Sequence, residues 1–164
     1  MGEVIIVAAI IVFILFPMIS AVIERYLINI KLQIIKDAVD ITNISTYVSI
    51  DPEYLGRNLV IHDQSEVWEI YSKLLSSNLN LKEDLSPEDN SVAEEKVKVE
   101  SIIIYTGDNP EKCPLGTDIR RPGVHSLITV PVKPSLYSQI ILNLMGKNSI
   151  ELRIHVDSEV PVNN

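Results

Sequence analysis

The chain opens with a long apolar run that limits what the rest of it can do. Residues 4 to 19 read VIIVAAIIVFILFPMI, with no charge, amide or hydroxyl group, and the run continues to Ile23. Glu3 and Glu24 therefore enclose twenty residues. At a rise of about 1.5 Å per residue, a helix of this length covers ~30 Å, the thickness of bilayer hydrocarbon. Such a segment must be covered by lipid or by other apolar surfaces.

A cleaved secretory signal is the least favoured interpretation of this run. Such signals have a basic start, an apolar core of about 7–15 residues and a small-residue cleavage site. Here no Lys or Arg precedes the run, the run is longer, and Ile19-Ser20-Ala21 is a poor cleavage signature. Two interpretations stay open: a plain membrane anchor for an outside domain, and a helix that leaves the membrane to pack against copies of itself. The first basic residue, Arg25, follows the span, and removal of a basic leader before Met1 would explain that order.

The first helix is expected to continue beyond the apolar run. Apolar residues recur there at spacings of three and four, as on one face of an amphipathic helix. The residues of this face are Tyr26, Leu27, Ile30, Ile34, Ala38, Ile41 and Ile44 or Ser45. We therefore expect one helix from about residue 3 to about residue 48, ended by Asp51-Pro52. Because Pro17 lacks a backbone N–H, a kink or short unwound stretch is expected near residues 13 to 17.

The remaining residues predict a small globular head. Asp63 and Glu66 have the spacing of a capping box, which opens a helix over about 64 to 79. The face of this helix is Val67, Ile70, Tyr71, Leu74 and Leu75. Residues 82 to 96 are acidic, polar and broken by proline, so they predict an exposed loop.

Alternation of apolar and polar residues predicts three strands, at 97–105, 124–132 and 149–157, with a long irregular loop over 106–123. Pro131 requires its strand to lie at an edge or to carry a bulge. A short helix is expected between Pro134 and Gly146. The predicted fold class is α+β: a helical stalk over 1–50, kinked near Pro17, and a head over 51–164 with one further helix and an antiparallel sheet of at least three strands.

Charge and the scarcity of reactive side chains exclude several functions. The net charge is −8, which argues against nucleic acid as a partner. Cys113 is the single cysteine, so no internal disulfide exists, and a buried or unreacted thiol is expected. The three histidines are scattered in the sequence, and His125 and His155 lie on predicted strands. We therefore expect no catalytic residues, no metal and no cofactor, and the chain is not expected to be an enzyme.

Three stretches together resemble the type IV pilin superfamily, and more narrowly the TadE-like pilins and pseudopilins of clostridia-type bacteria. They are the N-terminal run with Glu3 and Pro17, the segment KLQIIKDAVDITNISTYVSID (31–51), and the end PGVHSLITVPVKPSLYSQIILNLMGKNSIELRIHVDSE (122–159). The resemblance implies a leader cut by a prepilin peptidase and a conserved glutamate near the mature start. That glutamate usually lies fifth, whereas the acid here is third.

The resemblance implies a structural subunit of a pilus-like extracellular filament at the cell surface, reached through the cytoplasmic membrane. Its partners would be copies of itself, the membrane before assembly, and the pilus assembly machinery. The alternative is a minor pseudopilin or membrane-anchored component of a secretion or pilus machine. An anchored ligand-binding or enzymatic domain is the least favoured hypothesis. Adhesion, retraction and DNA uptake are all compatible with the sequence.

Packing between subunits is expected to use the N-terminal helix. The expected contact residues are Glu3, Phe13, Phe16, Pro17, Ile23, Tyr26 and Ile30. A carboxylate among packed apolar helices costs several kcal/mol unless it is paired. The expected partner of Glu3 is the α-amine of an adjacent subunit, and the other interpretation is a hydrated residue at the membrane surface.

Overall fold

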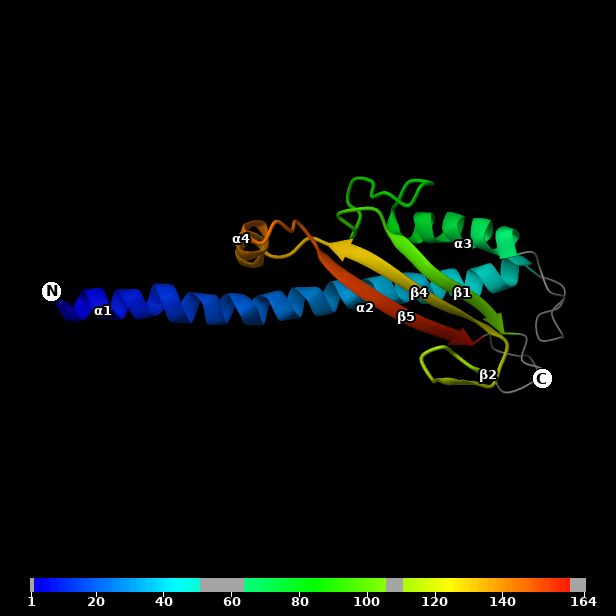
Figure 1. Cartoon of the computed structure of the whole chain (residues 1–164), viewed down its shortest axis with the longest axis horizontal. Coiled ribbons are helices and arrows are strands. Elements are labelled where there is room, and N and C mark those ends of the chain that lie inside the picture. Colours follow the sequence, from blue (N-terminus) through cyan, green and yellow to red (C-terminus); the bar gives the residue numbers. More distant parts are fainter. Residues whose placement is uncertain (1, 51–63, 106–110, 160–164) are drawn as a thin grey trace.

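One helix runs along the whole molecule and carries the head on its C-terminal half (Figure 1). The computed structural model describes residues 2–50, 64–105 and 111–159. The helix spans Gly2–Ile50 and consists of α1 (Gly2–Ile10), a π-helical turn η1 (Ile11–Leu15) and α2 (Phe16–Ile50). The predicted long helix is therefore confirmed, while its predicted end at Asp51-Pro52 lies outside the described residues.

Pro17 disturbs the helix where the sequence predicts, without breaking it. The turn that precedes the proline is a π-helix, in which the Phe16 N–H donates to the Ile11 carbonyl, five residues back. A π turn inserts one extra residue into the helix and re-forms the hydrogen-bond pattern. The wider turn therefore accommodates the proline ring, and the helix continues on both sides.

The head is an α+β unit, as predicted, with two helices and a three-stranded antiparallel sheet. The helices are α3 (Gln64–Leu79) and α4 (Leu136–Leu144), and the strands are β1 (Lys98–Tyr105), β4 (Gly123–Val132) and β5 (Ile150–Glu159) in the order β1-β4-β5. Inside the segment predicted as a loop, β2 (Glu111–Lys112) pairs with β3 (Asp118–Ile119). The capping residue predicted for α3, Asp63, lies outside the described residues.

Pro131 lies in the central strand and pairs with Glu151 of β5 without a shift of register, so the expectation of an edge strand or a bulge at the proline was wrong. The β1–β4 pairing begins only at Lys98, opposite Thr129, and the Glu94 N–H donates to the Pro131 carbonyl at 2.8 Å. The nitrogen and the oxygen of a strand residue point to the same side of the strand. The missing N–H of Pro131 therefore points to the side where β1 has not yet begun, and no hydrogen bond of the β1–β4 ladder is lost.

The main core lies between the sheet and the two helices α2 and α3. Alternate residues of β4 face it, and Ile128 is paired there with Ile154 of β5. The core residues of β4 are Val124, Ile128, Val130 and Val132, and those of α3 are Val67, Tyr71, Leu75 and Leu79. The other residues of β4 and β5 project from the opposite face of the sheet, because side chains alternate along a strand. This opposite face is called the outer face below.

The face of α2 that packs against the head is not the apolar face that the sequence indicates. The buried residues are Glu24, Ile35, Ala38, Val39, Thr42, Asn43, Thr46 and Tyr47, of which Ala38 alone belongs to that apolar face. Ile34 and Ile41, which belong to the expected apolar face, are 51% and 55% exposed. Four residues of the buried face, Glu24, Thr42, Asn43 and Thr46, are polar, so a pattern of apolar positions alone does not reveal this face.

Asn43 ties α2 to the sheet through its side-chain amide. Its Nδ2 donates to Ser158 Oγ at 3.0 Å and lies 3.2 Å and 3.3 Å from the carbonyl oxygens of Val124 and Val156. Ser158 in turn donates to Asp40 of α2. These bonds join the helix to β4 and β5 at a completely buried position, so they fix how the helix is rotated beneath the sheet.

Replacing Asn43 should therefore destabilise the head. We expect Asn43→Ala to lower the free energy of unfolding by about 1–3 kcal/mol, because buried partners lose their donor. The measurement is denaturant unfolding of the detergent-solubilised chain, followed by the fluorescence of Trp68. Asn29→Ala, at an exposed position on the same helix, is the control and should change the stability little. Equal stability of the two variants would contradict this role.

Candidate functional site on the N-terminal helix

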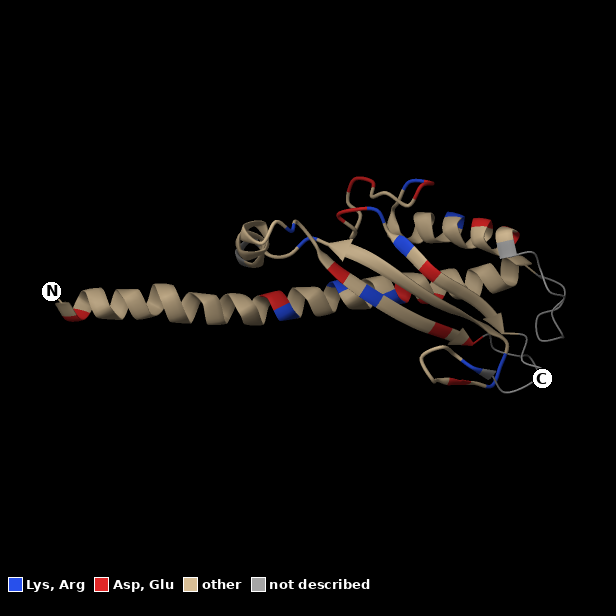
Figure 2. Ribbon diagram, in the orientation of Figure 1, with Lys and Arg blue, Asp and Glu red and all other residues tan. Residues whose placement is uncertain are grey.

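The front half of the long helix projects away from the head and is apolar on all sides. No charged residue lies between Glu3 and Glu24, and in Figure 2 the segment between them is tan, with neither blue nor red. Phe13 and Phe16 are 78% and 58% exposed. The helix is long and apolar enough to cross a membrane. The chain therefore carries a candidate transmembrane segment that nothing in the described residues covers.

An exposed apolar stripe continues from this segment along α2, beside the head. We call it the seam; its apolar residues are Ile23, Leu27, Ile30, Ile34, Ile41, Ile44 and Val48. The spacing alternates between four and three if Asp37 is counted, which is the heptad pattern of helices that pack along one another. All of these residues except the half-buried Ile44 are exposed. At about 1.5 Å per residue, the seam is ~38 Å long.

The seam lies on the side of α2 opposite to the side that holds the head. At 100° per residue, the positions of Ile34 and Ile41 fall more than a quarter turn from those of Ile35 and Val39, which are fully buried. Asp37 is the one polar member of the seam, and Gln33 Nε2 donates to its Oδ1 at 2.7 Å. The helix thus has two apolar faces, of which the head covers one.

The predicted packing residues fall on this exposed surface, but not all on one line. Ile23 and Ile30 belong to the seam, and Tyr26, 67% exposed, lies beside it. Phe13 lies in the π turn, and Phe16 and the half-buried Pro17 begin α2. Glu3 is exposed in α1, at the far end of the helix from the head. Ile34 and Ile41 were not among the expected contact residues, although they lie on the same apolar face as Ile30.

Glu24 anchors the head at the boundary of the apolar segment. Its side chain is buried, and the Ser135 N–H lies 2.9 Å and 3.2 Å from its two carboxylate oxygens. Ser135 is the N-cap residue of α4, so the carboxylate compensates the positive end of this helix. Figure 1 shows α4 at the end of the head nearest the bare helix. The exposed apolar residues of α4 and its C-cap are Ile140, Ile141, Leu144 and Met145.

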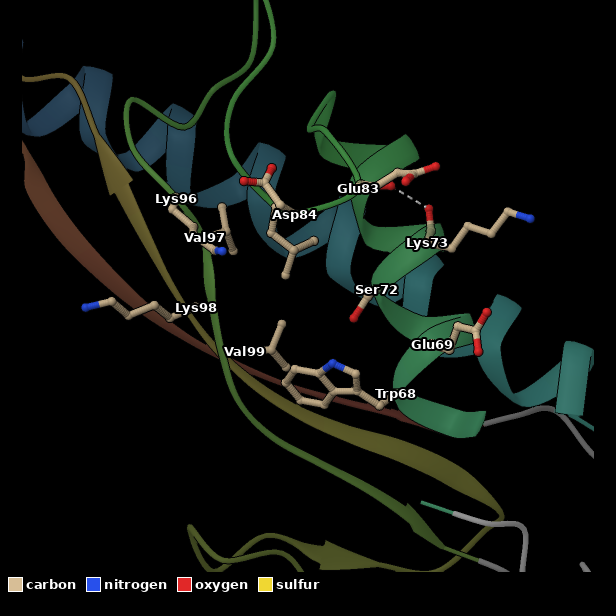
Figure 3. Close-up of a pocket in the computed structure, with 12 residues that line it drawn as sticks. Trp68, Glu69, Ser72, Lys73, Glu83, Asp84, Lys96, Val97, Lys98 and Val99 are labelled. Carbon is tan, nitrogen blue, oxygen red and sulfur yellow. Dashed lines mark hydrogen bonds between the residues drawn. The ribbon is translucent and has the colours of Figure 1, made fainter. Parts of the chain in front are cut away.

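A groove of about 770 Å³ between α3, the loop at 83–85 and the start of β1 is a weaker candidate site. Trp68 and Val99 form part of its lining (Figure 3). The charged residues around it are of both signs, and Lys73 and Lys98 point away from each other in Figure 3. Its charged groups therefore do not converge on one point, as recognition of a small ligand requires.

The expectation that the histidines are scattered was wrong for two of them. The rings of His125 and His155 lie 4.9 Å apart on the outer face of the sheet. The buried thiol of Cys113 lies 3.8 Å from His155 Nε2. The third histidine, His62, is outside the described residues.

Comparisons with known proteins leave the chain without an assigned relative. No protein-family model, curated protein or solved structure matches it. The class of protein that the fold defines is therefore an α+β head on a long apolar N-terminal helix, which is consistent with a membrane-anchored or pilin-like protein.

The bond between Glu24 and Ser135 should hold α4 in place. We expect Glu24→Ala to speed amide hydrogen exchange in residues 135–144 by roughly 10-fold or more, because hydrogen bonds to charged groups contribute about 1.5–3 kcal/mol. Exchange mass spectrometry of the chain in detergent measures this change. Arg25→Ala, at the exposed neighbouring position, should leave the exchange of α4 unchanged, and equal rates in the two variants would refute the role of Glu24.

Proposed function

We propose that this chain is the structural subunit of a type IV pilus-like extracellular filament, assembled through its N-terminal helix. The observation that carries the proposal is the exposed seam. It continues along the helix past the segment that the hydrocarbon layer of a membrane can cover. The resemblance to TadE-like pilins supports the same function.

Lipid alone does not account for the exposed apolar surface. The hydrocarbon layer is about 30 Å thick, and a helix over residues 4–23 already fills it. The seam begins at Ile23 and continues for ~38 Å beside the head. The head leaves Ile34 and Ile41 51% and 55% exposed. In a plain membrane anchor, these two side chains would therefore face water. Packing of helices from several subunits covers both the front half and the seam.

Copies of this chain are the occupant that fits the seam best. A partner must present an apolar helix of membrane length that continues directly into an apolar heptad stripe. This chain has that helix itself, and identical helices at successive positions would bury the same residues in every subunit. Completing the burial of about seven half-exposed side chains is worth on the order of 5–10 kcal/mol per helix, which reaches the range of micromolar contacts.

In this proposal the front half lies in the membrane before assembly and in the filament core afterwards. That transfer exchanges one apolar surrounding for another, so burial contributes little to it, and an assembly machinery must supply the work. Glu3 would then lie among packed helices, paired with the α-amine of a neighbouring subunit, since an unpaired carboxylate there is costly. Such a pair would set the axial register between subunits.

Electron microscopy of sheared cell-surface material, labelled with an antibody against the head, tests this function. We expect filaments that carry the label along their length. Label confined to sparse points would favour the minor pseudopilin, and label found only in the membrane would favour an anchored component.

Matched substitutions connect the filament to the seam. Ile34→Glu should abolish labelled filaments, because it places a charge among apolar neighbours, while the chain remains in the membrane fraction. Asn29→Glu introduces the same side chain at an exposed position off the seam and should leave filaments intact. Normal filaments from Ile34→Glu would contradict packing through the seam.

A further inference from the structure

Four side chains of the kinds that bind metal ions meet on the outer face of the sheet. His125 on β4 is paired with Asp157 on β5, and His155 precedes Asp157 by two residues. All three therefore project from the same face. Cys113 reaches them from the β2–β3 hairpin, which lies next to the end of β5 in Figure 1.

The distances between these groups are close to those of a metal site. Each of the four side chains offers one ligand atom, and all four atoms lie within 4.8 Å of one another. His125 Nδ1 is 2.8 Å from Asp157 Oδ1, and His155 Nε2 is 2.8 Å from Asp157 Oδ2. A tetrahedral zinc site, with bonds of about 2.0–2.3 Å, separates its ligand atoms by roughly 3.2–3.8 Å. Small side-chain adjustments bring the four atoms to that arrangement.

Asp157 Oδ2 is the atom that points most directly to a cation. It is completely buried and accepts no hydrogen bond from the described residues, although His155 Nε2 lies only 2.8 Å away. At that distance an aligned N–H would form a strong hydrogen bond. The two atoms would need to separate by less than about 1 Å to reach the spacing of two ligands on one zinc ion.

The burial of Asp157 suits the same role. Its side chain is 11% exposed, and both imidazole rings approach its carboxyl group. A buried carboxylate is costly unless a positive charge compensates it.

We propose that Cys113, His125, His155 and Asp157 bind one Zn²⁺ ion. The ligand atoms are the Cys113 sulfur, His125 Nδ1, His155 Nε2 and one carboxylate oxygen of Asp157. Cys113 releases its thiol proton to solvent on binding, so that one thiolate and one carboxylate balance the two positive charges. Sulfur, imidazole nitrogen and carboxylate oxygen in a four-coordinate site are the donors that zinc takes in proteins.

Outer contacts orient two of the ligands. His125 Nε2 lies 3.4 Å from Ser101 Oγ, so that its N–H has an acceptor while Nδ1 faces the ion. The Thr117 N–H donates to Cys113 Sγ at 3.3 Å and stabilises the thiolate. Partners of this kind are typical around metal ligands and fix the orientation of the rings and the sulfur.

The site is structural, because four protein ligands leave no position for a substrate. The ion joins the β2–β3 hairpin to β4 and β5. The apolar cluster under this hairpin is small, with Tyr105, Cys113 and Ile119 as its buried members. A metal cross-link supplies the stability that so small a cluster lacks.

A serine-hydrolase triad is the main competing use of the same residues. Ser101 Oγ contacts His125 Nε2, and His125 Nδ1 contacts Asp157 Oδ1. A serine, a histidine and an aspartate make contacts in this order in such a triad. However, the His125 side chain is completely buried, so a substrate has no access to it. The second oxygen of Asp157 also faces another histidine, which a triad does not require. The geometry therefore favours the ion.

Metal binding by the full chain in detergent tests the proposal. After removal of metal with a chelator, reloading with Zn²⁺ and removal of the excess, we expect about one zinc per chain by mass spectrometry. Co²⁺ used as a probe should give the absorption of a tetrahedral thiolate complex. Zinc should also raise the unfolding temperature, and a chelator should reverse that rise.

Variants on two different elements assign the ligands. Cys113→Ser and His155→Ala should each weaken zinc binding at least tenfold, and Cys113→Ser should also remove the thiolate absorption with Co²⁺. Glu151→Gln, an exposed acid on the same strand as Asp157, should bind zinc as the wild type does. In chelator, all of these variants should give the circular dichroism of the metal-free wild type, which separates lost ligands from misfolding. A wild type that retains no zinc, or equal zinc in Cys113→Ser and wild type, would overturn the proposal and leave a hydrogen-bonded cluster without an ion.

Discussion

The packing of the head on one side of α2 determines which side of this helix stays exposed. Ile35, Val39 and Tyr47 are completely buried on that side, so the helix cannot rotate to bring its other apolar side inward. The seam therefore remains outward, in line with an N-terminal segment that is apolar all round. The described residues leave this other side uncovered, and in the proposed filament it would pack against copies of the chain. Assembly would in that case follow from how the monomer folds.

Polar contacts along the same helix give the head a fixed position on it. Asn43 joins the C-terminal part of α2 to β4 and β5, and Lys31 Nζ in the middle of α2 donates to the Lys133 carbonyl at 2.5 Å. At the end of the apolar segment, the Glu24 carboxylate accepts a hydrogen bond from the Ser135 N–H and so holds α4 to α2. Three separated attachments prevent both rotation and sliding of the head. Every subunit would then present the seam at the same angle and height, which a regular helical filament requires.

Much of the fold could be predicted from the sequence, whereas the sites could not. Strong periodicities gave the long helix, α3 and the three strands, because each depends on local spacing alone. The side of α2 that the head covers could not be predicted, since Ile34 and Ile41 form a more apolar stripe than the side that carries Thr42 and Asn43. The cluster around His155 depends on the pairing of β4 with β5 and on the hairpin of Cys113, and no local pattern fixes either. The one available signal was the spacing of His155 and Asp157 on a predicted strand.

Disulfide cross-linking at Ile41 tests most directly whether the seam packs against copies of this chain. Ile41→Cys in intact cells, treated with a mild oxidant, should give cross-linked dimers and larger species of this chain. Asn29→Cys, which lies off the seam, should give few, and the wild type serves as a blank because its single cysteine is buried. Cross-linking at Ile41 no stronger than at position 29 would contradict the account, because the seam would then face lipid, water or a different protein.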